Sequence, residues 1–308
     1  MTINEAPVAT QELIDNLLYV FADENVLLTQ PRLIRRLDQL GERFYYYLEN
    51  NVATFFISTT SFIKKVTPTG PHLIEWFKKM GDKADQIRDE AADYGTLMHI
   101  CFADYHLTGY DFDKTTLIVK KYLVDLGYAC TKSRLGDWTK KLNKAVASYA
   151  KFCEDFVIEP VLIEGMLASE ELGIAGTLDL VAYATVKGRR ILVSVDFKSG
   201  SIQKSAQMQL AINKIIFEEN FPHLEIDENW SWSPKDFRDK PTYELANQTK
   251  TIYTPALIDH YLAIYQAEYG NELKGKTIHR FTGTVRPGQP IAERHQLLDV
   301  SDAVALNF

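Results

Sequence analysis

Cysteines are scarce in this 308-residue sequence, and long hydrophobic runs are lacking. The three cysteines, Cys101, Cys130 and Cys153, are widely spaced and odd in number, which excludes a disulfide-rich scaffold and predicts reduced thiols in the core. No apolar run reaches the roughly 18 residues that predict a transmembrane helix. The opening segment Met1–Pro7 lacks the basic and apolar regions of a signal peptide. We therefore expect a cytoplasmic protein that does not enter a membrane.

Net positive charge is lacking as well, because 41 acidic residues outnumber 34 lysines and arginines and give a net charge of −7. This balance disfavours a surface coated for indiscriminate binding of nucleic acids. It leaves open a locally basic surface beside an acidic site. An apolar fraction of 46% and an aromatic fraction of 12% are typical of a globular chain, and 308 residues can bury a large core.

The centre of the sequence contains two strand-like segments joined by a short turn. Residues 177–185 and 190–198 are rich in apolar residues with an alternating pattern, which is typical of β-strands. Between them, Lys187-Gly188 predicts a two-residue turn, so that Val186 pairs with Arg189. The two segments therefore predict a β-hairpin whose register follows from the turn.

This register places Asp179 directly opposite Asp196, with Cβ atoms roughly 4.5–5.5 Å apart. Two carboxylates at that distance repel each other unless one is protonated or a cation lies between them. Lys198 is two residues beyond Asp196 and points to the same face. Such a group suits a divalent metal ion with a charged neighbour.

Structural alternatives exist for the same three residues. Asp179 would then be a turn or edge residue, and Asp196 and Lys198 an ordinary ion pair on a solvent-exposed face. Residues 191–197 argue against this, because their nearly continuous apolar run is typical of a strand covered on both faces.

Four short motifs occur in order around this hairpin. They are Gly95-Thr-Leu-Met-His99, Gly176-Thr-Leu-Asp179, Asp196-Phe-Lys-Ser-Gly200 and Gln207-Met-Gln-Leu210. Together they resemble the motifs of the PD-(D/E)XK nucleases, specifically the RecB-like, phage-type exonuclease branch, and they are similar to those of mitochondrial genome maintenance exonucleases. The segment Ser58–Lys65 also resembles the region before the histidine helix in that branch.

The resemblance implies a fold and an activity. The fold is α/β, a restriction-endonuclease-like core in which a central mixed β-sheet is flanked by helices. The activity is metal-dependent exonuclease hydrolysis of DNA that leaves 5′-phosphates. The implied process is recombination, repair or phage DNA processing, and a recombination or single-strand-binding protein is a candidate partner. The sequence departs from the family pattern at Leu178, Ser199 and Asn213, where proline, threonine and tyrosine are usual. None of these positions is a metal ligand or the lysine.

The resemblance also implies roles for individual residues. The implied ligands of Mg²⁺ or Mn²⁺ are His99, Asp179, Asp196 and the backbone carbonyl of Phe197, with Glu164 as a candidate further ligand. Lys198 would orient or deprotonate the attacking water, and Gln209 would hydrogen-bond a water or a phosphate. Gln207 and Gln209 are two residues apart on a predicted helix, so only one of them can face the site. No iron–sulfur cluster is expected, because no cysteine follows Lys198.

Other interpretations remain open at this level. Each candidate residue also has a plain structural alternative. His99 would be a structural histidine, Glu164 an exposed glutamate of a strand, and Gln209 an exposed glutamine of a helix. For the whole chain, the alternatives are an endonuclease of the same fold, a catalytically silent DNA-binding or scaffold protein of a recombination complex, and a metal-dependent hydrolase of small nucleotides.

The stretch 114–151 is the most basic part of the sequence and contains aromatic residues. Basic groups interleaved with aromatics suit a groove for single-stranded nucleic acid. The candidate DNA-binding residues are Lys132, Arg134, Trp138, Lys140, Lys141 and Lys144. The alternative is a solvated helix face with Trp138 in the core.

The remaining pattern predicts three regions: an N-terminal extension over 1–54, a nuclease core over 55–225 and a C-terminal appendage over 226–308. The expected helices are residues 10–20, 32–40, 73–79, 82–106, 204–219 and 257–269, and the expected strands outside the central hairpin are 42–48, 52–57, 156–168 and 277–284. Trp230 and Trp232 are predicted in a loop, where they would stack on bases or pin the loop to the body.

Overall fold

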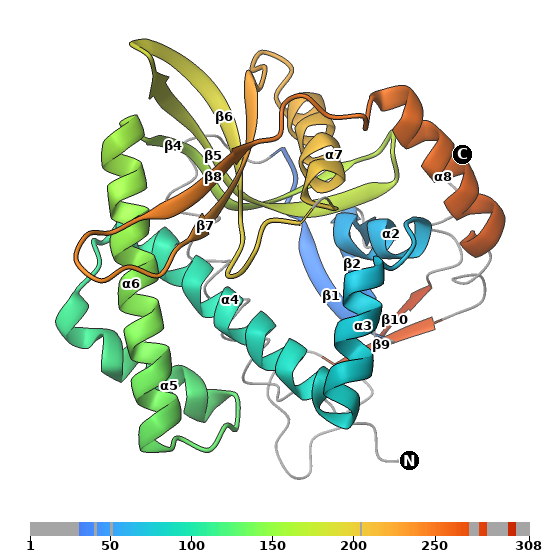
Figure 1. The fold of residues 1–308 in the computed structure, drawn as a ribbon. Helices are drawn as coiled ribbons and strands as arrows, with labels where there is room; N and C mark the ends of the chain where they lie inside the picture. The colour runs from blue at the N-terminus through green and yellow to red at the C-terminus, as the bar shows by residue number, and fades with distance from the viewer. Residues whose placement is uncertain are drawn as a thin grey trace.

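The computed structural model describes residues 31–39, 42–49, 52–203, 205–270, 277–281 and 295–299. These residues form an α/β fold in which helices cover both faces of an open, mixed sheet of eight strands (Figure 1). This arrangement confirms the predicted fold class, a central mixed β-sheet flanked by helices. Among the described residues, no helix combines the length and the apolar character that a membrane crossing requires.

The sheet has the strand order β1-β2-β3-β5-β6-β7-β8, and β4 pairs with β5 outside this path. Its strands are β1 (Arg35–Gln39), β2 (Glu42–Glu49), β3 (Val52–Ser58), β4 (Glu159–Ser169), β5 (Ile174–Val186), β6 (Arg189–Phe197), β7 (Glu228–Pro234) and β8 (Tyr243–Asn247). A separate two-stranded sheet pairs β9 (Thr277–Phe281) with β10 (His295–Asp299). The α-helices are α2 (Thr59–Val66), α3 (Pro71–Met80), α4 (Ala84–Leu107), α5 (Thr115–Asp125), α6 (Lys132–Phe156), α7 (Ser205–Asn220) and α8 (Pro255–Tyr269).

The central hairpin forms with the predicted register. β5 and β6 are antiparallel, and Val186 pairs with Arg189 across Lys187-Gly188. Both turn residues have positive φ, 51° and 77°, as a type I′ turn requires. The ladder continues in the same register to the pair just before Asp179 and Asp196.

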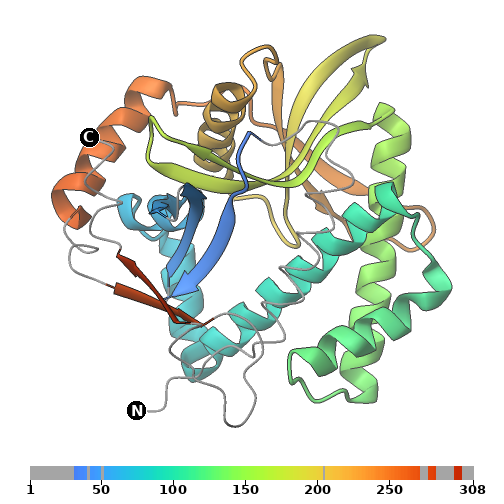
Figure 2. The same cartoon turned by 180° about the vertical axis from the view of Figure 1, so that it is seen from behind.

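Two hydrophobic cores lie on opposite faces of the sheet. On one face α4, α5 and α6 pack against β5, β6 and β7, and on the other α2, α7 and α8 cover β4 and β5. Figures 1 and 2 show the two helical layers from the front and from behind. Within β6, Val193 and Val195 face the first core and Leu192 faces the second. The strand is therefore covered on both faces, as its continuous apolar run predicts.

The sheet opens beside the middle of β5. At its start, β5 runs parallel to the end of β3 and pairs with it through Ala175 and Ser58. From Leu180 onward the same edge of β5 pairs with β6, while β4 follows the other edge. Between these two ladders, residues 176–179 have no partner on this edge within the described part of the chain. The carboxyl ends of β3 and β6 therefore border the opening from its two sides.

Two predictions of local structure need correction. A helix was expected over 32–40, but this segment contains β1, whose pairing with β2 outweighs the helical spacing of its apolar residues. The strand expected from residue 156 begins at Glu159, because α6 continues to Phe156. The expected helix 10–20 lies outside the described residues.

Strands from both flanking regions belong to the same sheet. β1 and β2 come from the predicted extension 1–54, and β7 and β8 come from the predicted appendage 226–308. Trp230 and Trp232 are in β7 rather than in a loop, and they are 2% and 0% exposed. Their rings are core side chains, so they are not available for stacking on bases.

Candidate active site

A cavity of about 370 Å³ lies at the opening in the sheet. Its walls come from β1 and β2, the start of α2, α4, the strands β4 to β6 and α7. The residues predicted to bind metal or to act in catalysis all line it: His99, Glu164, Asp179, Asp196, Phe197, Lys198 and Gln209. The fold therefore brings the four sequence motifs to one place.

Asp179 and Asp196 lie on the neighbouring strands β5 and β6. Asp179 Oδ2 accepts a hydrogen bond of 2.7 Å from the backbone N–H of Phe197. Asp196 is 2% exposed, and its Oδ1 accepts a hydrogen bond of 2.7 Å from Lys198 Nζ. Asp196 Oδ2 is buried and has no hydrogen-bond partner within the described residues. A buried carboxylate oxygen without a donor is costly, so this atom is a ready ligand for a cation.

Helix α4 carries His99 to these carboxylates. His99 Nδ1 lies 2.8 Å from Glu164 Oε1 and 3.7 Å from Asp179 Oδ1. One turn earlier, Gly95 lies next to Ser199, and a Cβ at Gly95 would be in ordinary van der Waals contact with Ser199 Oγ at 3.5 Å. The Gly-x-x-x-His motif therefore places Gly95 beside Ser199, which follows β6, and His99 beside Asp179 of β5, and all four residues line the cavity.

Glu164 has an unusual backbone conformation for a strand residue. It lies between Ile163 and Gly165, which pair with Leu180 and Leu178 on either side of Asp179 in β5. Its φ of +48° falls in the left-handed region, which costs a residue other than glycine about 1–2 kcal/mol. Such strain concentrates at functional sites. The strain and the contact with His99 together favour a role in the site over the alternative of an exposed strand glutamate.

The grouped charges change the proton affinities of the site. Burial raises the pKa of Asp179 and that of Asp196 to about 6. For His99, burial by itself lowers the pKa, but Asp179 and Glu164 outweigh it and raise the pKa to about 9. For Lys198, burial also acts to lower the pKa, and the carboxylates of Asp196 and Asp179 raise it above its ordinary value. At neutral pH, the site itself therefore holds two protonated cations among its carboxylates.

Helix α7 presents Gln209 to the cavity. Lys198 Nζ donates a hydrogen bond of 3.3 Å to Gln209 Oε1, whereas Gln207 donates one of 2.8 Å to Gln248. This geometry agrees with the prediction that only Gln209 faces the site. Asn213, one turn further along α7, also lines the cavity; it is 4% exposed and its Oδ1 has no partner among the described residues.

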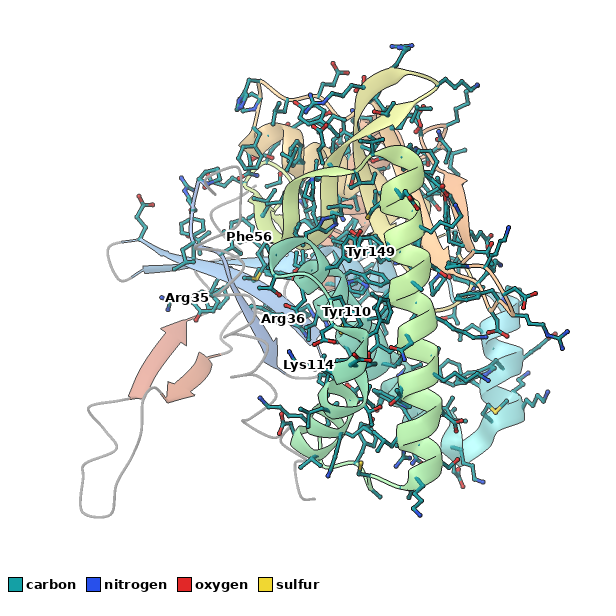
Figure 3. The ribbon with its side chains drawn as sticks, turned by 90° about the vertical axis from the view of Figure 1, so that its left-hand side faces the viewer. Arg35, Arg36, Phe56, Tyr110, Lys114 and Tyr149 are labelled. Carbon is teal, nitrogen blue, oxygen red and sulfur yellow. The ribbon has the colours of Figure 1, made fainter. Side chains whose placement is uncertain are left out.

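Part of the cavity wall was not predicted. Arg36 on β1, Arg43 on β2 and Tyr45 line the cavity, and the Tyr45 hydroxyl lies 3.0 Å from Thr177 Oγ1. Arg36 is labelled beside Arg35 on β1 in Figure 3. An arginine in an N-terminal hairpin has no sequence signal for an active site, because only the tertiary pairing of β3 with β5 brings β1 and β2 to the cavity. These side chains add positive charge to a cavity that is otherwise rich in carboxylates.

Gly176 lies where β5 passes the start of α2. A Cβ there would be 2.8 Å from Thr59 Oγ1 and 3.2 Å from Asn213 Oδ1. We expect Gly176→Ala to lower the free energy of unfolding by about 1–3 kcal/mol, as overpacking does. The matched control is Gly136→Ala on α6, where a Cβ meets nothing within 4 Å and alanine should stabilise by up to about 1 kcal/mol. Urea unfolding measures both changes, and equal stability of the two variants would contradict the close packing at Gly176.

The predicted DNA-binding residues of α6 do not form one free surface. Trp138 is 7% exposed and packs against Tyr94 and Tyr122 in the core. Its burial excludes the predicted stacking on bases and agrees with the core alternative. Arg134 pairs with Glu90 of α4. Figure 3 shows α6 beside α4, with the buried Tyr149 of α6 labelled.

The lysines of α6 have different surroundings. Lys141 lies over the ring of Tyr94, and Lys144 pairs with Asp236. Lys132, Lys140 and Lys144 line a shallow groove of about 550 Å³ beside α5, which shares no lining residue with the cavity that contains His99 and Asp179. DNA binding in this groove stays a prediction.

The donor set of the cavity fits a hard or borderline divalent ion. His99, Glu164 and Asp179 offer ligand atoms within 4.8 Å of one another. Asp196 adds the unpartnered Oδ2. Carboxylate oxygens with one imidazole suit Mg²⁺ or Mn²⁺. The carbonyl of Phe197 stays a predicted ligand.

Comparisons with known proteins assign no family to the chain. No protein-family model matches it, and no curated protein matches it significantly. The function is therefore argued from the chemistry of the site and from the motifs that form it.

Proposed function

We propose that the chain is a metal-dependent deoxyribonuclease of the PD-(D/E)XK type. It would act from DNA ends as an exonuclease and leave 5′-phosphates. The observation that carries the proposal is the meeting of Asp179, Asp196 and Lys198 with His99 and Glu164 in one cavity. These residues come from four separate elements, β4, β5, the end of β6 and α4. The β5–β6 hairpin accounts for the approach of Asp179, Asp196 and Lys198, and tertiary packing adds His99 from α4.

The charges of the site suit phosphodiester hydrolysis. Glu164, Asp179, Asp196 and His99 would hold Mg²⁺ or Mn²⁺. A bound ion supplies a water of lowered pKa and positive charge for the phosphate. Lys198 keeps its proton, because the carboxylates raise its pKa against the effect of burial. It would therefore donate to a water or a phosphate oxygen rather than act as a base, and its contact with Gln209 Oε1 would hold the ammonium group in place.

The test is cleavage of end-labelled linear single-stranded and double-stranded DNA, beside a closed circle, in Mg²⁺, Mn²⁺ or EDTA. The expected result is metal-dependent loss from the ends with 5′-phosphorylated products and an intact circle. Cleavage of the circle would indicate an endonuclease of the same fold instead. Cleavage of free nucleotides without regard to polymer length would indicate a small-nucleotide hydrolase. Binding of DNA without cleavage in any metal would overturn the proposal and favour a silent binding protein.

Lys198→Met is expected to lower the rate of hydrolysis about 100- to 10,000-fold, because it removes a cationic donor from the reacting phosphate. Lys235→Met is the matched control, since Lys235 is an exposed lysine paired with Glu244 outside the cavity. Steady-state cleavage of labelled DNA at saturating metal measures both variants. A rate near that of the unchanged protein in Lys198→Met would show that the lysine has no part in the reaction.

A further inference from the structure

Helix α3 is amphipathic and yet exposes its apolar side chains. Leu73 is 48% exposed and Ile74 is 42% exposed, while Trp76 and Phe77 are half-buried and form an edge-to-face pair 5.2 Å apart. None of the α3 side chains that the structure describes is buried. A ten-residue helix of this composition normally covers its apolar stripe against the core. A contiguous exposed apolar surface is typical of an interaction site.

Positive charge accompanies this surface. Lys78 and Lys79 in the last turn of α3 are exposed, as are Lys64 in α2 and Lys83 just before α4. Two exposed carboxylates, Glu75 in α3 and Asp82 just after it, occur among these lysines, so residues 64–83 contain five lysines and two carboxylates in a chain whose net charge is −7. Aromatic and apolar side chains beside lysines match a partner that has a phosphate backbone and unpaired, stackable bases.

The position of α3 connects it to the catalytic cavity. The chain enters α3 from α2, whose first residues Thr59 and Thr60 line the cavity, and leaves it into α4, which lines the cavity with residues between Ala91 and Ile100. Figure 1 shows α3 between these two helices. Helix α3 itself does not line the cavity, but it lies between two helices that do, so a DNA strand that leaves the cavity along either helix would run toward α3.

We infer that the exposed face of α3 binds the unpaired bases of a single-stranded DNA segment next to the cavity. This inference rests on the proposed nuclease function. It adds that the DNA next to the cavity is single-stranded, which the proposed function does not specify. Trp76 and Phe77 would stack on bases, and Lys78 and Lys79 would neutralise phosphates.

The tryptophans of the chain make a direct test possible. The chain has four, and Trp138, Trp230 and Trp232 are 7%, 2% and 0% exposed. Iodide in solution should therefore quench mainly the fluorescence of Trp76. In EDTA, which prevents cleavage, a single-stranded (dT)20 oligonucleotide is expected to protect this fluorescence from iodide. Trp76→Phe should remove the iodide-sensitive component and so assign the signal.

Binding of a labelled (dT)20 gives a second measurement. Trp76→Ala is expected to weaken binding about tenfold, as the loss of one stacking contact does, and Trp76→Phe should retain most of the affinity. Lys78→Ala with Lys79→Ala should reduce the slope of log affinity against log salt by about 0.7 for each lysine. Arg189→Ala with Lys250→Ala, two exposed basic residues outside the stretch 114–151, is the matched control and should leave the affinity unchanged.

The outcomes separate this inference from the proposed function. Hydrolysis of DNA by the unchanged protein, with Trp76 fully open to iodide in the presence of (dT)20, would overturn the inference alone. Protection of Trp76 by (dT)20 would support the inference even if no metal produced cleavage, which would remove only the proposed function. Protection by vesicles of phosphatidylglycerol but not by (dT)20, or protection that rises with protein concentration alone, would assign the face to a membrane surface or to a second copy and would overturn it.

Discussion

Replacement of Asp179 by asparagine is expected to lower the rate of DNA hydrolysis at least about a thousandfold, or about 4 kcal/mol of activation free energy. Asp179 offers a ligand atom together with His99 and Glu164, so the variant would deprive a divalent ion of one negatively charged ligand. Cleavage of end-labelled DNA across a range of metal concentrations measures the effect. Asp137→Asn, which changes an exposed aspartate of α6, is the matched control and should keep full activity.

The same variant is expected to stabilise the metal-free protein by about 3 kcal/mol at about pH 8. Burial raises the pKa of Asp179 to about 6, from 3.8 for an ordinary aspartate. The folded state therefore binds the proton of Asp179 more tightly than the unfolded state does. The stability that this proton supplies is lost as the pH rises through about 6, and an asparagine, which is always neutral, does not lose it.

Urea unfolding in EDTA at about pH 8 and at about pH 4.5 measures this difference, which should shrink at the lower pH. Loss of activity together with a gain in stability would distinguish a functional carboxylate from a structural one. A variant that lost both activity and stability would mean that Asp179 holds the fold together, and the proposed metal site would then need another explanation.

Metal binding is expected to release about one proton and to tighten roughly tenfold per pH unit between about pH 6.5 and pH 8.5. Asp179 and Glu164 outweigh the effect of burial and raise the pKa of His99 to about 9. An imidazole must lose its proton before it binds a metal ion, so the affinity rises as the deprotonated fraction rises. Below about pH 6, Asp196 and Asp179 also become protonated, and the dependence on pH should become steeper.

Calorimetric titration with Mn²⁺ in two buffers of different ionisation enthalpy measures the released protons. His99→Asn should weaken binding at pH 8.5 and flatten the dependence on pH above about 6.5. His260→Asn, which changes an exposed histidine of α8, is the matched control. Proton release that survives in His99→Asn would show that another group supplies the proton, and His99 would not be a ligand.

Local pattern alone predicts much of the central part of the fold. The Lys187-Gly188 turn determines the pairing of β5 with β6, because a two-residue turn leaves one register for the strands that it joins. The alternation of side chains then places Asp196 and Lys198 on one face. The helical spacing of Gln207 and Gln209 likewise allows only one of them at the site, and the structure places Gln209 there.

Burial could not be predicted in the same way. Trp138 and Trp230 have sequence neighbours that are basic or polar, which favours an exposed aromatic for stacking on bases. Both are core residues, because α6 packs against β7 and the two side chains belong to the same hydrophobic core. The segment 32–40 has the apolar spacing of a helix, yet it pairs as β1 with β2, since a ladder of backbone hydrogen bonds to a distant strand outweighs a weak local preference.

The sequence by itself determined the hairpin and the shared face of Asp196 and Lys198, because each depends on spacings of a few residues. The resemblance of the motifs supplied the candidate ligands. Only the tertiary structure decided where these groups lie in space. It separates β3 from β6 along one edge of β5 and so makes the opening that holds the site. It also brings Arg36 to the cavity and Glu164 into contact with His99. Such contacts join elements far apart in the chain, and they depend on how whole surfaces pack rather than on any local spacing.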